Sequence, residues 1–270
     1  MKRIEKAPVV VMDFSGAYEW EEFAANSHFV HINCEDIQGT KCILSRVACR
    51  EINRRIGRFD ARGIHFIDSG DYHYMTKLWT DKIHEPFTLI LVDHHTDMQP
   101  SQVPEIITCG DWVNSVIDGN KYLKQIILLG MPRKSIEQIP QRYRKHVDYI
   151  DKPQFMEILS GRLSLNIMGK AYLSIDKDVL NEQNAVTNWD QGQATVAELQ
   201  QFVSLLLEKE KVMGIDVCGE FPVMKSLFDE EKAAEVDDMA NEALLDVVEK
   251  QVLHKERAST GPTLSLSTAR

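Results

Sequence analysis

Short runs of consecutive apolar residues recur along the chain, and most are followed at once by polar residues. Apolar runs of this length, with little polar alternation, are typical of strands that are buried on both faces of a parallel sheet. The predicted strands cover residues 8–12, 28–32, 64–67, 89–92, 125–129, 147–150, 171–175 and 212–215. They predict a largely parallel sheet, with residues 147–150 as a short edge strand.

Between these runs, apolar residues recur at the spacing of a helix. Residues 195–210 are the clearest case, because their apolar positions share one face and Thr195 with Glu198 has the pattern of a capping box. The other predicted helices cover residues 16–25, 42–56, 72–83, 112–117, 155–163 and 229–253. Strand, polar loop and helix alternate throughout, which predicts a three-layer α/β/α fold with a mostly parallel central sheet. We expect one domain over residues 1–255 and a disordered Ser/Thr-rich tail over residues 256–270.

Composition narrows the class of protein. The chain has 270 residues, of which 43% are hydrophobic, and a net charge of -10, which argues against nucleic-acid or anionic-membrane partners. Five cysteines without a C-x-x-C pair argue against a disulfide framework or a zinc finger. No signal peptide or apolar stretch of membrane-spanning length is found. We therefore expect a cytoplasmic protein with a small-molecule substrate, and a homo-oligomer is left open.

The densest polar cluster follows the predicted strand at residues 89–92. Asp93, His95 and Asp97 alternate, so an extended chain would point all three in one direction. Two carboxylates and an imidazole that converge suit a divalent cation. Acidic or histidine residues also follow other strands, namely His73, Asp176, Asp178, Asp216 and Glu220. This is more than one cation needs, and two bridged ions would acidify a shared water into hydroxide. The competing interpretation is an ordinary loop of capping and hydrogen-bonding residues.

Four segments resemble motifs of the ureohydrolase (arginase/agmatinase) family. Residues 93–97, Asp-His-His-Thr-Asp, resemble its DAHTD motif, and residues 174–178, Ser-Ile-Asp-Lys-Asp, resemble its SxDxD motif. Residues 69–73 are similar to its GGDH motif with one residue inserted, and residues 214–217 are similar to its late strand. Their order and spacing agree over roughly residues 8–250, so the chain is identified as a divergent member.

The resemblance implies an arginase-like fold and a pair of Mn²⁺ ions. One ion would be held by His73, Asp93, Asp97 and Asp176, and the other by Asp93, His95, Asp176 and Asp178. Asp97 would also accept a hydrogen bond from the hydroxide that bridges the ions. The family hydrolyses C–N bonds of guanidino compounds. The implied function is therefore a binuclear metal hydrolase that cleaves a C–N bond in a small guanidino, amidino or amide substrate.

The chain departs from the family where the substrate would bind. Residues 108–112 stand near the place of a proton-shuttling histidine in the arginase branch, and Asp111 is a candidate acid/base in its stead. Gly219 occupies the position of the family's guanidinium-binding glutamate, so Glu220, one residue on, becomes a candidate catalytic residue. Residues 181–192, including Trp189, replace a Pro/Gly-rich segment. We expect a retained metal site and a rebuilt substrate site.

Two other functions are open. Residues 92–95 also resemble the DHH signature of manganese phosphoesterases, although residues 13–16 match that family's DPDA motif poorly and Asp176 and Asp178 would lack a role. The second alternative is a non-catalytic relative that retains the metal.

The remaining conspicuous side chains are interpreted as structural: His94 as a bystander, and Cys109, Cys218, Trp112 and Trp189 as packing residues.

Overall fold

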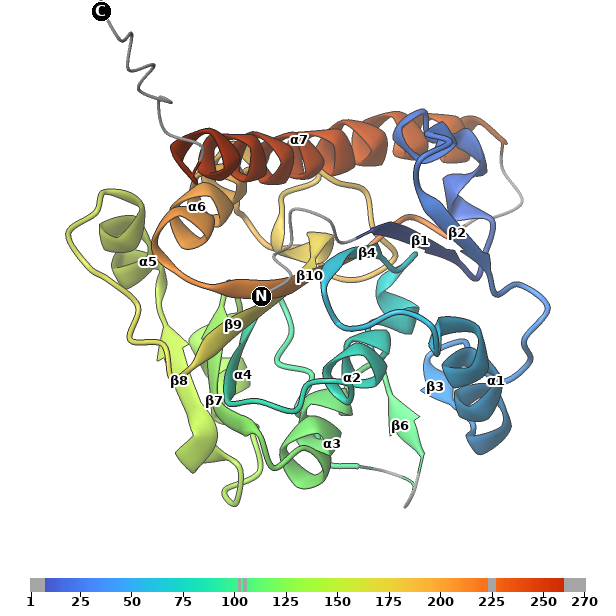
Figure 1. Ribbon diagram of the computed structural model, residues 1–270. Helices are drawn as coiled ribbons and strands as arrows, with labels where there is room; N and C mark the ends of the chain where they lie inside the picture. The colour runs from blue at the N-terminus through green and yellow to red at the C-terminus, as the bar shows by residue number, and fades with distance from the viewer. Residues whose placement is uncertain (1–7, 102, 104–105, 223–226, 260–270) are drawn as a thin grey trace, which may run out of the picture.

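Eight parallel strands form the central sheet of the computed structural model, which describes residues 8–101, 103, 106–222 and 227–259 (Figure 1). The strands are β1 (Val9–Asp13), β2 (Val30–Asn33), β4 (Gly63–Phe66), β5 (Phe87–Val92), β7 (Leu123–Leu129), β8 (Val147–Ile150), β9 (Lys170–Asp176) and β10 (Val212–Cys218). Their order across the sheet is β2-β1-β4-β10-β9-β5-β7-β8, and every neighbouring pair is parallel. The predicted parallel sheet, with β8 at its edge, is confirmed.

Helices cover both faces of this sheet (Figure 1). One face carries α1 (Arg46–Ile56), α2 (Met75–Thr80) and α3 (Trp112–Gly119), and the other carries α5 (Lys152–Leu159), α6 (Val196–Lys209) and α7 (Leu227–Ser259). Short elements join them: α4 (Arg133–Ile136), the 3-10 helices η2 (Ala17–Trp20), η3 (Phe23–Ala25), η4 (Gly70–Tyr72), η5 (Arg144–His146) and η6 (Lys177–Val179), and the antiparallel pair β3 (Ile43–Leu44) and β6 (Ile107–Thr108). The three-layer α/β/α architecture is therefore as predicted.

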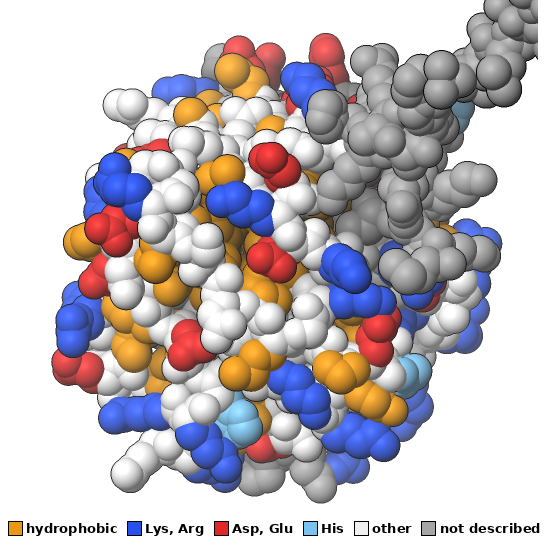
Figure 2. All heavy atoms as spheres, turned by 60° about the vertical axis from the view of Figure 1, so that its left-hand side comes forward, with side chains coloured by type: hydrophobic (Ala, Val, Ile, Leu, Met, Phe, Trp, Pro, Cys, Tyr) orange, Lys and Arg blue, Asp and Glu red, His pale blue; other side chains and the backbone are white. Residues whose placement is uncertain are grey.

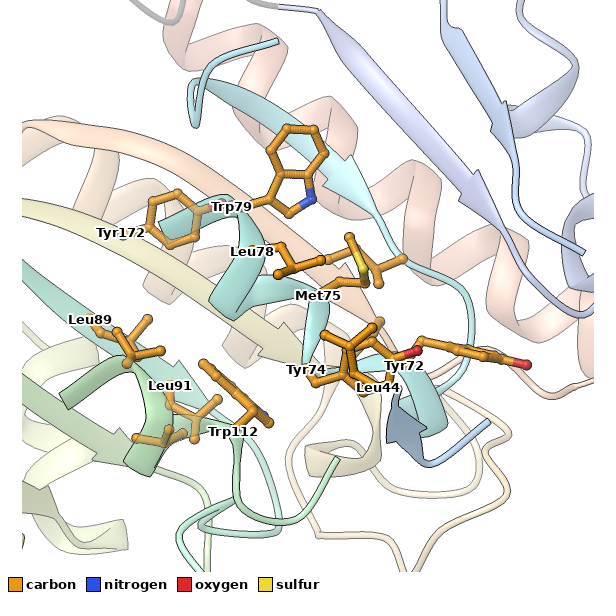
Figure 3. Close-up of a cluster of buried hydrophobic side chains, with 14 of the residues drawn as sticks. Leu44, Tyr72, Tyr74, Met75, Leu78, Trp79, Leu89, Leu91, Trp112 and Tyr172 are labelled. Carbon is orange, nitrogen blue, oxygen red and sulfur yellow. The ribbon is translucent and has the colours of Figure 1, made fainter. Parts of the chain in front are cut away.

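Alternation along each strand divides the core into two layers. Leu89 and Leu91 point to the side of α2 and α3, where Figure 3 shows Trp112 lying next to Leu91. Ile90 and Val92 point to the opposite side, into the cluster that includes the apolar face of α6. Because both faces are covered, the strands are apolar at successive positions, which explains the uninterrupted runs in the sequence.

On the face that carries α5 and β8, charges of both signs are interspersed with hydrophobic side chains (Figure 2).

Several element boundaries differ from the predicted ones for identifiable reasons. Residues 43–44 pair with β6, so α1 begins only at Arg46, where the Ser45 side chain accepts from the Ala48 N–H. The predicted helix at 155–163 begins earlier, at Lys152, because Asp151 and Gln154 form a capping box. The capping box of Thr195 is present as predicted.

The last helix also departs from its predicted bounds. α7 continues to Ser259, so residues 256–259 extend it, whereas residues 260–270 lie outside the described residues. Among the helices that the structure describes, none combines the length and apolar composition that a membrane crossing requires.

The order of the strands determines where polar side chains meet. The last two strands in the chain, β9 and β10, lie between β4 and β5 at the centre of the sheet. The carboxyl ends of β4, β10, β9 and β5 are therefore neighbours, although residues 73 and 218 are far apart in the sequence. Ligands of open α/β sheets bind at this edge.

Gly214 in β10 provides a test of this close central packing. A Cβ added there would lie 2.0 Å from the backbone oxygen of Ala61, so the strand or its neighbour would have to move. We expect Gly214→Ala to lower the free energy of unfolding by about 1–3 kcal/mol in chemical denaturation. Gly119→Ala is the control, because its nearest contact is the flexible end of Lys77 at 3.4 Å. Equal unfolding midpoints for the two variants would contradict the prediction.

Candidate metal centre

His73 is held in a fixed orientation at the carboxyl edge of the sheet. It follows η4 directly, and it is 1% exposed. Its Nε2 lies 2.8 Å from the Oγ of Ser174, which in turn lies 2.9 Å from the Oγ1 of Thr76. The serine of the SxDxD-like motif thus orients the imidazole, and Nδ1 is the ring nitrogen left to face the sheet edge. A hydrogen bond of this kind on one ring nitrogen is typical of histidines that bind metals through the other.

Three carboxylates surround the Nδ1 of His73. Oδ2 of Asp97 lies 3.0 Å away, Oδ2 of Asp93 3.2 Å and Oδ2 of Asp176 3.4 Å. Despite these distances, the His73 Nδ1 and the Asp93 Oδ2 are buried and have no hydrogen-bond partner among the described residues. Buried polar atoms are rarely left unpaired in proteins. The atoms converge on a common point without hydrogen-bond geometry, as ligands of a cation do.

A second cluster shares Asp93 with the first. The His95 Nδ1 lies 2.7 Å from the Asp178 Oδ2 and 3.7 Å from the Asp93 Oδ1. Backbone N–H groups position both carboxylates, because His95 donates to Asp93 and His94 donates to Asp178. The ligand atoms of Asp93, His95 and Asp178 lie within 4.8 Å of one another, as do those of His73, Asp93 and Asp97. Five of the six sequence-predicted ligands thus form two adjoining candidate metal clusters, and the sixth, Asp176, lies 3.4 Å from His73 in a third group of donors.

The electrostatics of these clusters favour a cation. Burial, then the charges of Asp178 and Asp97, raise the pKa of Asp93 well above its ordinary value. Burial and the neighbouring Asp176 also raise the pKa of Asp178, to about 6. Burial alone would lower the pKa of His95, but the hydrogen bond with Asp178 raises it to about 9. Burial and mutual repulsion thus disfavour the ionised forms of Asp93 and Asp178, and a divalent cation at this place would offset both effects.

Trp112 fixes the position of Asp97. Its Nε1 donates to the Asp97 Oδ2 over 2.5 Å, and its ring lies 4.9 Å from that of His73. Asp97 itself adopts a left-handed backbone conformation with φ 48°, and its backbone oxygen accepts from Val113. The prediction that Trp112 is a packing residue captured its burial but missed this contact. The available signal was the indole N–H, which needs a partner when it is buried.

Trp189 is a partly exposed aromatic residue beside the clusters. The residue is 39% exposed, its ring lies 5.9 Å from that of His95, and its Nε1 donates to the Asp71 Oδ1 over 3.1 Å. Gly70 permits this approach, because a Cβ there would lie 2.9 Å from the Asp176 Oδ2 and 3.0 Å from the Trp189 Cδ1. The side chain of His95, which is 32% exposed, lies next to Trp189. The clusters are therefore partly open to solvent on the side of His95.

The structure places Asp111 and Glu220, the other predicted catalytic residues, and the strand-end residue Asp216 in supporting contacts. Asp111 precedes α3, and its carboxylate accepts a hydrogen bond from the Thr108 N–H over 2.7 Å. This contact stabilises the loop in which Asp111 lies. Asp216 is buried between His65 and Tyr172, at 2.7 and 2.8 Å. The prediction that Glu220 contacts substrate needs correction. Its side chain is 0% exposed and is paired with a buried lysine.

That lysine is Lys177, which stands between Asp176 and Asp178 in the chain. Lys177 is the first residue of η6, directly after the end of β9, and its side chain is fully buried on the side of α7. Its Nζ donates to Glu220 and lies 3.2 Å from the Asp237 Oδ1. Burial would lower the pKa of Lys177, but the two carboxylates raise it above its ordinary value, so it stays charged.

Helix α7 completes this buried polar group. Asn241 donates to Glu220 over 3.0 Å and to Glu21 over 2.7 Å. Asp237 also accepts from the Val186 N–H, in the loop that leads to Trp189. The end of β9, the loop after it and α7 are thus joined on the side of the sheet opposite the metal clusters.

Cys218 is a further residue that the sequence interpretation assigned to packing. It is fully buried at the end of β10, next to Asp176 in the parallel register, and its Sγ lies 3.2 Å from the Asp176 Oδ2. Its Sγ, one nitrogen of His73 and one oxygen of Asp176 all lie within 4.8 Å of one another. Only the adjacency of β9 and β10 reveals this, because 42 residues separate Cys218 from Asp176 in the chain.

Sequence comparisons with known proteins find a family match and a relative. The family model described as Arginase family matches residues 8–234. An uncharacterized protein of Thermotoga maritima is 28% identical over 210 residues, which is 78% of each chain.

Solved structures agree in fold. The match to the agmatine ureohydrolase of Thermoplasma volcanium has a TM-score of 0.60 at 15% identity. It covers 95% of this chain and 94% of the ureohydrolase chain. The Trypanosoma cruzi formiminoglutamase with Mn²⁺ has a TM-score of 0.61 at 14% identity and covers 92% and 96%.

The buried cation Lys177 supplies a stability test. Lys177→Met leaves the carboxylates of Glu220 and Asp237 buried without their cation, and we expect the free energy of unfolding to fall by about 3–5 kcal/mol. Lys170→Met is the matched control, because Lys170 pairs with Glu85 at 2.6 Å near the surface and should cost at most about 1 kcal/mol. The double variant Lys177→Met/Glu220→Gln should recover part of the loss. Equal losses for Lys177→Met and Lys170→Met would contradict the anchoring role.

Proposed function

The chain belongs to the arginase family, and we propose that it is a metal-dependent hydrolase of a C–N bond in a small guanidino, amidino or amide substrate. The observation that carries the proposal is the pair of ligand clusters that share Asp93 at the carboxyl edge of the sheet. The names of the structural neighbours, which include a ureohydrolase, a formiminoglutamase and an amidino hydrolase, support the choice of substrates to test.

The described residues fit two divalent cations, and Mn²⁺ suits their mostly carboxylate and imidazole donors. His73, Asp93, Asp97 and Asp176 would hold one ion, and Asp93, His95, Asp176 and Asp178 the other. The unpaired His73 Nδ1 and Asp93 Oδ2 support this fit. Such a pair of ions lowers the pKa of a water and polarises the bond under attack.

The protein residues around the clusters have separate tasks in this proposal. Asp97, whose Oδ2 is held by Trp112, is placed to accept a proton from the attacking water. The exposed side of His95 leaves room for the substrate carbon to approach. The indole of Trp189 beside it offers an aromatic face to a planar cationic group such as guanidinium or amidinium. Asp71, already bonded to Trp189 and Asn188, fixes that face rather than contacting substrate.

The phosphoesterase alternative finds little support in the structure. Asp13, which would have to supply its DPDA-like motif, accepts from the Gly16 N–H over 2.7 Å in a turn after β1. Asp176 and Asp178, which that alternative leaves without a role, lie within the candidate clusters. Release of phosphate from nucleotides, without ammonia or urea, would favour it nonetheless.

The metal itself is tested by elemental analysis and thermal unfolding. We expect two divalent ions per chain, a lower melting temperature after chelation, and recovery on addition of Mn²⁺. At a free ion concentration 100 times Kd, ion binding raises the free energy of unfolding by about 2.7 kcal/mol per site. Asp93→Asn should abolish the rise in melting temperature on Mn²⁺ addition, whereas Asp81→Asn, at an exposed carboxylate, should keep it. Absence of Mn, Fe, Co and Zn together with no Mn²⁺-induced shift would refute the centre.

The reaction is tested by measuring urea and ammonia released from a panel of guanidino, amidino and formimino compounds. Asp97→Asn should lower kcat by about 10²–10⁴-fold, because it removes the proposed proton acceptor. Metal content and melting temperature of this variant are measured in parallel, to separate loss of chemistry from loss of ions. A wild-type protein that binds metal, but turns over no member of the panel, would indicate the non-catalytic relative.

A further inference from the structure

We propose that Cys218 is a metal ligand, through Sγ, at the position formed by His73 and Asp176. The proposal rests on the metal centre proposed above and deepens it, because it makes one of the two ion positions a mixed thiolate, imidazole and carboxylate site. The family resemblance gives Cys218 no role as a metal ligand. The position of Cys218 in the sheet places it at the candidate metal centre.

The parallel register of β9 and β10 places Cys218 beside Asp176. The two residues are direct partners at the carboxyl ends of adjacent central strands, so their side chains project from the same face. Cys218 is 0% exposed and is a free thiol. Its Sγ lies 3.2 Å from the Asp176 Oδ2, the same oxygen that lies 3.4 Å from the His73 Nδ1. Sulfur, oxygen and nitrogen donors therefore converge from β10, β9 and the segment after β4.

A second observation indicates that this convergence serves an ion. The His73 Nδ1 is buried, is directed at the cluster, and has no hydrogen-bond partner among the described residues. The other ring nitrogen is occupied by Ser174, so the imidazole is already held in the orientation of a ligand. An ion bound between this nitrogen and the Asp176 Oδ2 would lie beside the sulfur, because Sγ is 3.2 Å from that same oxygen and within 4.8 Å of a ring nitrogen of His73.

The simpler role for Cys218 is a hydrogen bond. A thiol is a weak donor, and the S–H could orient Asp176 without touching an ion. The two roles differ in chemistry. As a ligand, Cys218 forms an Sγ–metal bond, its S–H bond breaks, and the proton leaves to the solvent. As a hydrogen-bond donor it keeps the proton, and only Asp176 binds the ion.

Thiolate ligation has a consequence for metal choice. Soft thiolates select Zn²⁺, Co²⁺ and Fe²⁺ more strongly than Mn²⁺, which prefers oxygen donors. The position formed by Asp93, His95 and Asp178 has only oxygen and nitrogen donors. The two positions are therefore chemically unequal, and we expect the thiolate position to prefer a softer ion than its neighbour.

Cobalt substitution tests the ligand directly. We expect the protein loaded with Co²⁺ to show an intense thiolate-to-cobalt charge-transfer band in the near ultraviolet, and Cys218→Ser to lose that band at equal cobalt content. Cys109→Ser, which removes another buried thiol, is the matched control and should keep it. X-ray absorption of the wild-type cobalt protein should show a cobalt–sulfur contribution, a measurement that does not depend on the variant folding.

Competition between metals separates ligation from a hydrogen bond. Loss of the thiolate should lower the affinity of Cys218→Ser for Zn²⁺ relative to its affinity for Mn²⁺ by roughly tenfold or more. Tenfold is the smallest typical effect of removing a group that only hydrogen-bonds a metal ligand, and a ligand should contribute at least as much. Equal losses for Zn²⁺ and Mn²⁺, or bound cobalt without a band or sulfur scattering, would overturn ligation and leave the metal centre intact. A protein that binds no Co²⁺ at all would overturn both.

Discussion

The concentration of negative charge at the centre of the sheet edge is the constraint on which the rest of the site depends. Four aspartates, Asp93, Asp97, Asp176 and Asp178, are buried there beside the buried imidazole of His73 and the partly exposed one of His95. Burial of ionised carboxylates without a counter-charge is costly. Every contact around them directs a donor atom inward or satisfies the opposite side of the same group. Ser174 holds His73, Trp112 holds Asp97, and the backbone holds Asp93 and Asp178. Such an arrangement is stable when a multiply charged cation completes it.

The step from β9 into η6 connects this charge to the opposite side of the sheet. Asp176 and Asp178 face the candidate ions, and Lys177 between them faces Glu220 and the α7 residue Asp237. The same three residues therefore present negative charge to one layer and positive charge to the other. The long C-terminal helix supports this side of the strand end, because Asp237 lies beside Lys177 and Asn241 donates to Glu220.

Prediction from sequence succeeded where residues close together in the chain determine the structure. Apolar runs indicated the strands, and Thr195 with Glu198 indicated a helix start. The Asp/His cluster after β5, together with Asp176 and Asp178 at the end of β9, was predicted to bind metal. The structure gathers these residues at one edge, and ligation itself stays a prediction. Prediction failed where the partner is distant. Glu220 is acidic and near the motif, yet it serves Lys177. Trp112 and Cys218 looked like packing residues, yet their polar atoms reach Asp97 and Asp176.

The sequence alone determined the layered fold, the family and the set of candidate ligands, because these follow from periodicity and from short motifs whose members are close in the chain. Tertiary structure alone decided which faces those ligands share and what surrounds them. The insertion of β9 and β10 between β4 and β5 joins His73, Asp93, Asp176 and Cys218 at one point. No spacing in the sequence encodes that adjacency, since it depends on strand order and register across the whole sheet.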